Sequence, residues 1–185
     1  LAAVNGVVAT VVVRSSRRRQ YDTYFLFGDM ETSRLRYRED EILARDDEVD
    51  TVVYRLTLIG ETKEREFPRS VVLSRSRFDA PATHSRRFYR EYFQPEEGIK
   101  VHKERHRYHF RYGGTDFALN LDRIIQPELP GVYLEIKSRT WSAQDAERKA
   151  ELMGELLDLF GVEDEEIVKA EYVELTVEEE EEQAA

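Results

Sequence analysis

Segments in which polar and apolar residues alternate recur along most of this chain, and no other feature constrains its fold as strongly. Successive side chains of a β-strand point to opposite faces, so each segment predicts a strand with one polar and one apolar face. The pairs Gly113-Gly114 and Pro130-Gly131 are typical of turns between strands. Many strands with short connections indicate an antiparallel sheet or barrel. The expected strands are residues 7–14, 22–27, 34–40, 52–59, 99–110, 116–124 and 132–139.

One segment has the pattern of a helix instead. Residues 142–160 begin with Ser142, a good helix cap, and Asp145 follows three residues later as in a capping box. Apolar residues then recur at spacings of four and three, which predicts a helix that packs on the outside of the sheet. Gly161 then marks the C-terminal end of the expected helix. A second short helix is expected around residues 165–175, and residues 60–98 are expected to hold one or two strands and loops.

The charge of the chain is unevenly distributed. The 185 residues fit one domain and carry a formal net charge of -10. Residues 163–182 contain eleven acidic residues and one lysine, so the remainder has 27 basic and 27 acidic residues and is neutral. The acidic composition therefore does not exclude an anionic ligand. We expect a single domain over residues 1–177 and an acidic, disordered tail over residues 178–185.

Composition excludes several other classes of protein. The chain has no cysteine, so it has neither a disulfide framework nor a thiolate nucleophile. Its apolar segment at residues 7–13 is far shorter than the roughly 20 residues of a membrane-spanning helix. We expect a cytoplasmic protein without a membrane partner. Because the sequence begins with Leu1, we also expect that a segment or a fused domain lies upstream or downstream.

The polar faces of the expected strands are rich in cations. Arg34, Arg36 and Arg38 share one face of their strand. Other strands repeat the pattern with a few carboxylates and polar groups added, and these polar faces contain Arg55 and Thr57, Lys103, Arg105 and Arg107, Asn120 and Asp122, and Glu135, Lys137 and Arg139. By contrast, the basic run of residues 17–19 is expected in a solvated loop, so nucleic acid is not an expected partner.

Two arrangements satisfy this alternation. In the first, the apolar faces form the core and the arginines are solvated, as is common for antiparallel sheets. In the second, helices cover the apolar faces and the charged faces enclose a tunnel. Such a tunnel needs an anion of high charge density, and guanidinium groups bind phosphate oxygens bidentately. Asp122 and Glu135 on the same wall are then expected to hold Mg²⁺ or Mn²⁺.

Several short motifs occur in an order that resembles one known family. They are residues 20–25, 35–38, 54–58, 103–105, 118–122, 131–136, the capped helix and residues 171–175. Together they cover nearly the whole chain and are similar to the CYTH, or triphosphate tunnel metalloenzyme, superfamily. Its members include triphosphatases and class IV adenylyl cyclases and have a polar tunnel of eight antiparallel strands. The resemblance implies an α+β fold, with an antiparallel barrel that forms a polar tunnel and helices packed outside.

The resemblance also implies roles for individual residues. Arg36 and Arg38 resemble the basic pair that grips the triphosphate, and Lys103 and Arg105 resemble a later basic strand. The residues expected to bind substrate are Arg36, Arg38, Arg55, Lys103, Arg105 and Lys137. Asp122 and Glu135 resemble the acidic residues on the metal side, so we expect them to be both the catalytic residues and the ligands of Mg²⁺ or Mn²⁺.

The chain departs from the family pattern in three places. The Glu-x-Glu-x-Lys motif of the first strand is absent, which is compatible with N-terminal truncation. Ile59 stands where the family has a lysine. Lys137 replaces the second glutamate of a late Glu-x-Glu motif, and a lysine there favours phosphate over metal.

The leading functional prediction is a metal-dependent hydrolase of triphosphate or polyphosphate, in which water attacks the terminal phosphorus. Catalysis would then consist of positioning and charge neutralisation. One alternative is a non-catalytic regulatory domain that binds polyphosphate or a nucleotide. The other alternative is an adenylyl cyclase similar to class IV.

Overall fold

The computed structural model describes residues 11–28, 33–60, 63–74 and 78–184. Most of the strands form one antiparallel sheet in the order β6-β3-β2-β1-β7-β8-β9, and β4 and β5 form a separate hairpin. The strands are β1 (Val11–Leu26), β2 (Ser33–Leu43), β3 (Val49–Gly60), β4 (Lys63–Phe67), β5 (Val71–Ser74), β6 (Phe78–Pro81), β7 (Glu97–Tyr112), β8 (Thr115–Gln126) and β9 (Tyr133–Lys137). The helices are α1 (Arg86–Phe93), α2 (Ala143–Leu159) and α3 (Tyr172–Ala184), with 3₁₀ turns at Pro68–Ser70 and Asp164–Glu166. The predicted α+β class with a mainly antiparallel sheet is confirmed.

The central strand β1 differs from its prediction. Residues 11–14 and 22–26 of two expected strands belong to one strand, β1, and residues 7–10 lie outside the described residues. The basic run at residues 17–19, predicted to be a solvated loop, lies inside β1, where each residue pairs with both β2 and β7. Arg18 is buried and contacts Asp40 at 2.6 Å. That prediction was wrong because a charged residue remains in a strand when its neighbour supplies the opposite charge.

The helices agree only partly with the sequence pattern. In α2, the Oγ of Ser142 accepts a hydrogen bond from the backbone amide of Asp145, as the capping pattern predicts. The short helix α1 was not predicted, and the helix expected at 165–175 begins only at residue 172. Helix α3 includes residues 178–184, the part of the chain assigned to an acidic tail. Among the described residues, no helix combines the length and apolar character needed to cross a membrane.

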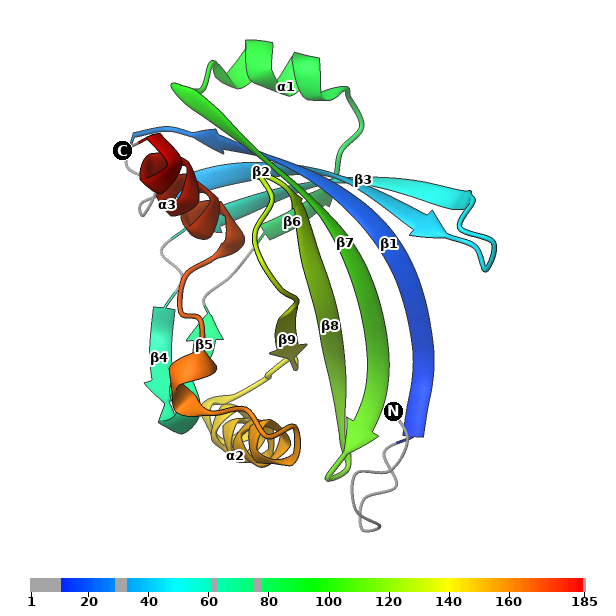
Figure 1. Cartoon of the computed structure of the whole chain (residues 1–185), viewed down its shortest axis with the longest axis vertical. Helices are drawn as coiled ribbons and strands as arrows, with labels where there is room; N and C mark the ends of the chain where they lie inside the picture. The colour runs from blue at the N-terminus through cyan, green and yellow to red at the C-terminus, as the bar shows by residue number, and fades with distance from the viewer. Residues whose placement is uncertain (1–10, 29–32, 61–62, 75–77, 185) are drawn as a thin grey trace.

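Over the described residues the sheet does not close into a barrel. Its edge strands β6 and β9 pair on one side only, with β3 and β8 respectively. They are also short, four and five residues against sixteen in β1. The predicted closed barrel is therefore not found in the described chain. Figure 1 shows a curved sheet with one open side.

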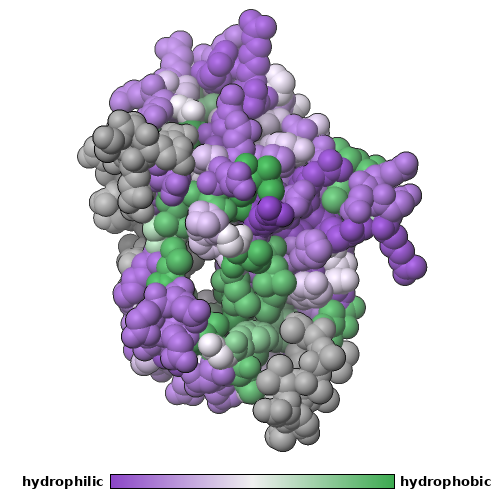
Figure 2. Space-filling view, in the orientation of Figure 1, coloured by the Kyte–Doolittle hydropathy of each residue, from purple (hydrophilic) through white to green (hydrophobic). Residues whose placement is uncertain are grey.

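Side-chain contacts connect the two ends of this open sheet. The β4–β5 hairpin follows β3 along the chain, whereas α2 follows β9. Arg69 of the hairpin turn contacts Asp158 of α2 and Asp164, and it donates to the carbonyl oxygen of Val162 (2.6 Å). Lys169 contacts Glu66 of β4 at 3.2 Å. Figure 1 shows these elements on the open side of the sheet, and Figure 2, in the same orientation, shows an opening in this face of the molecule.

Helices lie on both faces of the sheet. We call the face that carries Arg38 and Arg105 the inner face and the opposite one the outer face. Helix α1 covers the outer face at Phe25 and Tyr37, and α2 covers it with Leu156 against β7 and β8. These two match the prediction of helices packed outside. Helix α3 does not, because its buried Val173 packs in a cluster on the inner face with Tyr24, Ile59, Val101 and Ile124.

The outer core yields a direct test of the fold. Leu156 is 2% exposed in the cluster of Phe110, Phe117 and Leu119, so Leu156→Ala should lower the free energy of unfolding by about 2 to 5 kcal/mol. Leu159→Ala in the same helix removes the same atoms from a side chain that is 38% exposed, and should cost much less. Urea unfolding followed by circular dichroism measures both variants. Equal losses would contradict this packing of α2.

Candidate functional site

The inner face carries a cavity of about 360 Å³ that is rich in cations, which we call the basic cavity. Strands β1, β2, β3, β6, β7 and β9 and residues 168–172 line it. All six predicted substrate-binding residues and Glu135 lie on its wall. Its charged lining residues are the cations Arg36, Arg38, Arg55, Lys103, Arg105, Arg107 and Lys137 and the carboxylates Asp79, Glu135 and Glu171. Asp122 does not line the cavity but is fully buried behind Arg105.

Strand register explains why residues from distant parts of the chain meet there. Arg55, Arg38 and Asp22 form one row across β3, β2 and β1. Arg105 stands opposite Asp122 of β8. Partners opposite one another in an antiparallel pair point to the same face, so both rows present their charges to the inner face.

Two buried ion pairs fix the cavity wall. Arg38 donates from Nε and Nη2 to the two carboxylate oxygens of Asp22, both at 2.6 Å. Arg105 makes the same bidentate contact with Asp122 at 2.6 and 2.5 Å. Burial alone would raise the pKa of Asp22, but the charge and hydrogen bonds of Arg38 lower it to about 2. Asp22 therefore keeps its charge and holds the Arg38 guanidinium in place.

Three other guanidinium groups of the cavity have no carboxylate partner among the residues that the structure describes. Arg36 of β2 donates to the hydroxyl of Thr57 at 3.1 Å, and its buried Nε has no hydrogen bond to any described residue. Arg107 of β7 donates to the amide oxygen of Asn120, at 2.8 Å, and to no other described side chain. Arg55 of β3 is exposed and forms no ion pair with another described residue. These three groups are available to an anionic ligand.

The crowding of cations also shows in their acid–base behaviour. Burial lowers the pKa of Lys103 to about 7, and the charges of Arg105 and Arg38 act in the same direction. Burial and Arg105 likewise lower the pKa of Arg107 to about 10. Lys103 contacts Asp122 at 3.3 Å and lies over the Tyr172 ring, 4.2 Å from its centroid. An anion in the cavity would relieve this repulsion.

The two carboxylates expected to bind a metal are already engaged. Both oxygens of Asp122 accept from Arg105. In Glu135, Oε1 contacts Lys137 at 2.7 Å, and Oε2 accepts from Arg105 at 3.1 Å and from Asn120 at 2.9 Å. No cluster of three or more metal-ligating side chains occurs in the described part of the chain. Because every oxygen of the pair faces an N–H donor, these residues do not fit Mg²⁺ or Mn²⁺ as arranged.

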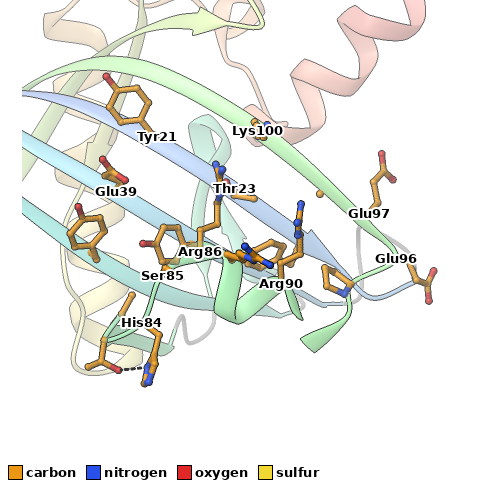
Figure 3. A pocket seen from close by; sticks show the side chains of 18 residues that line it. Tyr21, Thr23, Glu39, His84, Ser85, Arg86, Arg90, Glu96, Glu97 and Lys100 are labelled. Atoms are coloured by element: carbon orange, nitrogen blue, oxygen red, sulfur yellow. Dashed lines mark hydrogen bonds between the residues drawn. The ribbon is translucent and has the colours of Figure 1, made fainter. Parts of the chain in front are cut away.

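A second, larger cleft of about 1080 Å³ lies on the outer face beneath α1. Figure 3 shows Arg86 and Arg90 of α1 reaching over the strand that carries Thr23. No sequence pattern indicated this cleft, because α1 was not predicted. Its cations Arg86, Arg87, Arg90 and Lys100 are nearly balanced by the carboxylates Glu39, Glu96 and Glu97. The excess of positive charge favours the basic cavity as the anion site.

Two residues that shape the basic cavity were missing from the predicted site residues. The spacing places Arg107 on the same polar face as Lys103 and Arg105, but no role was assigned to it. Asp22 is the partner of Arg38, but only the pairing of β1 with β2 shows this.

Comparisons with known proteins provide information on the fold of this chain alone. No family model matches the sequence, and no curated protein matches it. The PH1819 protein from Pyrococcus horikoshii OT3 has a similar structure, with a TM-score of 0.64, 15% identity and coverage of 89% of this chain and 86% of that chain. A conserved hypothetical protein from Pyrococcus furiosus has a TM-score of 0.55 and 19% identity, with coverage of 90% of this chain and 86% of that chain. The PH1012 protein from Pyrococcus horikoshii OT3 has a TM-score of 0.53 and 18% identity, with coverage of 86% of this chain and 82% of that chain.

The Asp22–Arg38 pair predicts how stability depends on pH. Asp22→Asn leaves a buried guanidinium without a counter-charge, which should cost about 3 to 5 kcal/mol at neutral pH. The pKa of Asp22 is about 2 in the folded chain and about 3.9 when unfolded, so its contribution is complete above about pH 4. The stability difference between wild type and variant should therefore shrink as pH falls from 4 towards 2.

Denaturant unfolding at several pH values measures this difference. Asp116→Asn is the matched control, because Asp116 pairs with Arg111 at the exposed end of the β7–β8 hairpin. It should have little effect at any pH. A constant penalty for Asp22→Asn from pH 7 down to pH 2 would contradict the ion pair.

Proposed function

We propose that this chain binds a triphosphate or polyphosphate group in the basic cavity. The observation that carries the proposal is the presence of Arg36, Arg55 and Arg107 on one cavity wall without carboxylate partners among the described residues. Guanidinium forks match phosphate oxygens in geometry and charge. A bound phosphate chain would satisfy the buried Nε of Arg36, which has no partner in the described chain.

The spread of these guanidinium groups favours an extended anion. Arg55 lies on β3 and Arg107 on β7, with β2 and β1 between them. Adjacent strands are roughly 4.8 Å apart, so their backbones are separated by about 14 Å, which the long side chains and the curvature of the sheet reduce. A chain of several phosphate groups contacts more of these residues at once than a single phosphate does.

Binding is common to all three functions expected from the sequence. The engaged oxygens of Asp122 and Glu135 favour a binding domain for polyphosphate or a nucleotide over a metal-dependent enzyme. Hydrolysis, adenylyl cyclisation and the resemblance to the CYTH superfamily stay predictions. A phosphate-release assay on tripolyphosphate, with and without magnesium or manganese, separates hydrolysis from binding.

The unpaired guanidinium groups provide the test of binding. Arg36→Ala and Arg107→Ala should each weaken tripolyphosphate binding by about 10- to 150-fold, because a hydrogen bond to a charged group is worth about 1.5 to 3 kcal/mol. Isothermal titration calorimetry measures the dissociation constants. Binding to the wild type should also weaken with added salt.

Arg123→Ala is the control for this test. Arg123 lies on β8, opposite Glu104, and points to the outer face, where it is exposed. Its loss should change affinity by less than about threefold, since it is remote from the cavity. If Arg123→Ala weakens binding as much as Arg36→Ala does, or if the wild type does not bind tripolyphosphate, the assignment is wrong.

A further inference from the structure

The position of Lys137 bears on how the basic cavity neutralises its ligand. Lys137 lies two residues after Glu135 on β9, so both side chains point to the same face. Its Nζ is 2.7 Å from Oε1 of Glu135. Burial opposes ionisation of Glu135, but the charges of Lys137 and Arg105 outweigh it and hold the pKa of Glu135 well below its usual range. The carboxylate is therefore ionised and already neutralised by protein groups.

The two carboxylates predicted to bind a metal offer a divalent cation no unoccupied oxygen in the described part of the chain. To bind Glu135 it would have to displace Lys137 from Oε1, or Arg105 and Asn120 from Oε2. To bind Asp122 it would have to break the bidentate contact with Arg105. It would also approach several fixed cations, since Arg105, Arg107 and Lys103 line the same cavity. Both desolvation and like-charge repulsion oppose metal binding here.

The cavity has enough positive charge of its own for an anion. Seven cations and three carboxylates line it, and Asp22 and Asp122 add two negative charges behind the wall. With Lys103 protonated, two positive charges remain in excess. Guanidinium and ammonium groups can therefore attract a phosphate chain into the cavity without a metal ion.

We propose that the basic cavity binds polyphosphate without a divalent metal ion, because the Lys137 ammonium occupies the place at Glu135 that a metal would take. This inference rests on the proposed function and specifies the chemistry of the same site. The ligand is then the free polyanion, not its magnesium complex. Magnesium competes with the protein for the ligand instead of assisting its binding.

Calorimetry with sodium tripolyphosphate tests the inference on the wild-type chain. We expect binding in buffer that contains EDTA, and no gain in affinity when excess magnesium or manganese replaces the EDTA. Binding that appears only with a divalent ion overturns the inference and leaves the proposed function standing. An absence of binding in both buffers overturns the proposed function, and the inference falls with it.

A charge-reversal variant tests the role of Lys137 itself. Lys137→Glu places two carboxylates side by side on β9, which is a donor pair that Mn²⁺ accepts. Without metal, its affinity for tripolyphosphate should fall by at least about tenfold, and Mn²⁺ should recover part of that loss. Electron paramagnetic resonance of free Mn²⁺ should detect a manganese site in Lys137→Glu and none in the wild type, both without tripolyphosphate.

Lys100→Glu is the matched control. It makes the same change of charge at an exposed position of β7 that borders the cleft on the outer face. It should create no Mn²⁺ site and should alter tripolyphosphate affinity by less than about threefold. A Mn²⁺ site of similar affinity in the wild type and in Lys137→Glu would overturn the role of Lys137.

Discussion

The bidentate contacts between buried carboxylates and guanidinium groups are the interactions on which the inner face depends. Asp22 holds Arg38 and Asp122 holds Arg105, and neither carboxylate is accessible to water. Without these partners, cations on neighbouring strands would repel one another in a poorly solvated space, at a cost of several kcal/mol each. The pairs allow a charged face to be buried, and they leave the remaining cations oriented towards the cavity.

This arrangement determines how the sheet is covered. Two apolar clusters of the outer face pack against α1 and α2, while the inner face is partly covered by α3 and bordered by the β4–β5 hairpin. The two ends of the sheet are connected through Arg69 and Lys169 instead of through strand hydrogen bonds. A cavity enclosed in this way can admit an extended ligand that a closely packed core would exclude.

The sequence allowed much of this site to be predicted, because a strand alternates its faces with a strict period of two. Arg36, Arg38, Lys103 and Arg105 are all where that spacing puts them. The ion-pair partners could not be predicted, since the contact of Arg38 with Asp22 depends on the register between β1 and β2. The predicted closure of the barrel is not found in the described chain, and the alternating pattern could not decide it, because the lengths of the edge strands β6 and β9 depend on tertiary packing. Helix α1 was missed because it is only eight residues long and rich in arginine.

A crystal structure of the chain with bound tripolyphosphate, grown in the presence of EDTA, is the most direct test of the central claim that the inner face is an anion site. We predict phosphate density in the basic cavity, with its oxygens within hydrogen-bonding distance of Arg36, Arg55 and Arg107. The pairs Asp22–Arg38 and Asp122–Arg105 should remain intact beside it. Density confined to the cleft beneath α1, or phosphate bound only after Arg38 has left Asp22, would contradict the account.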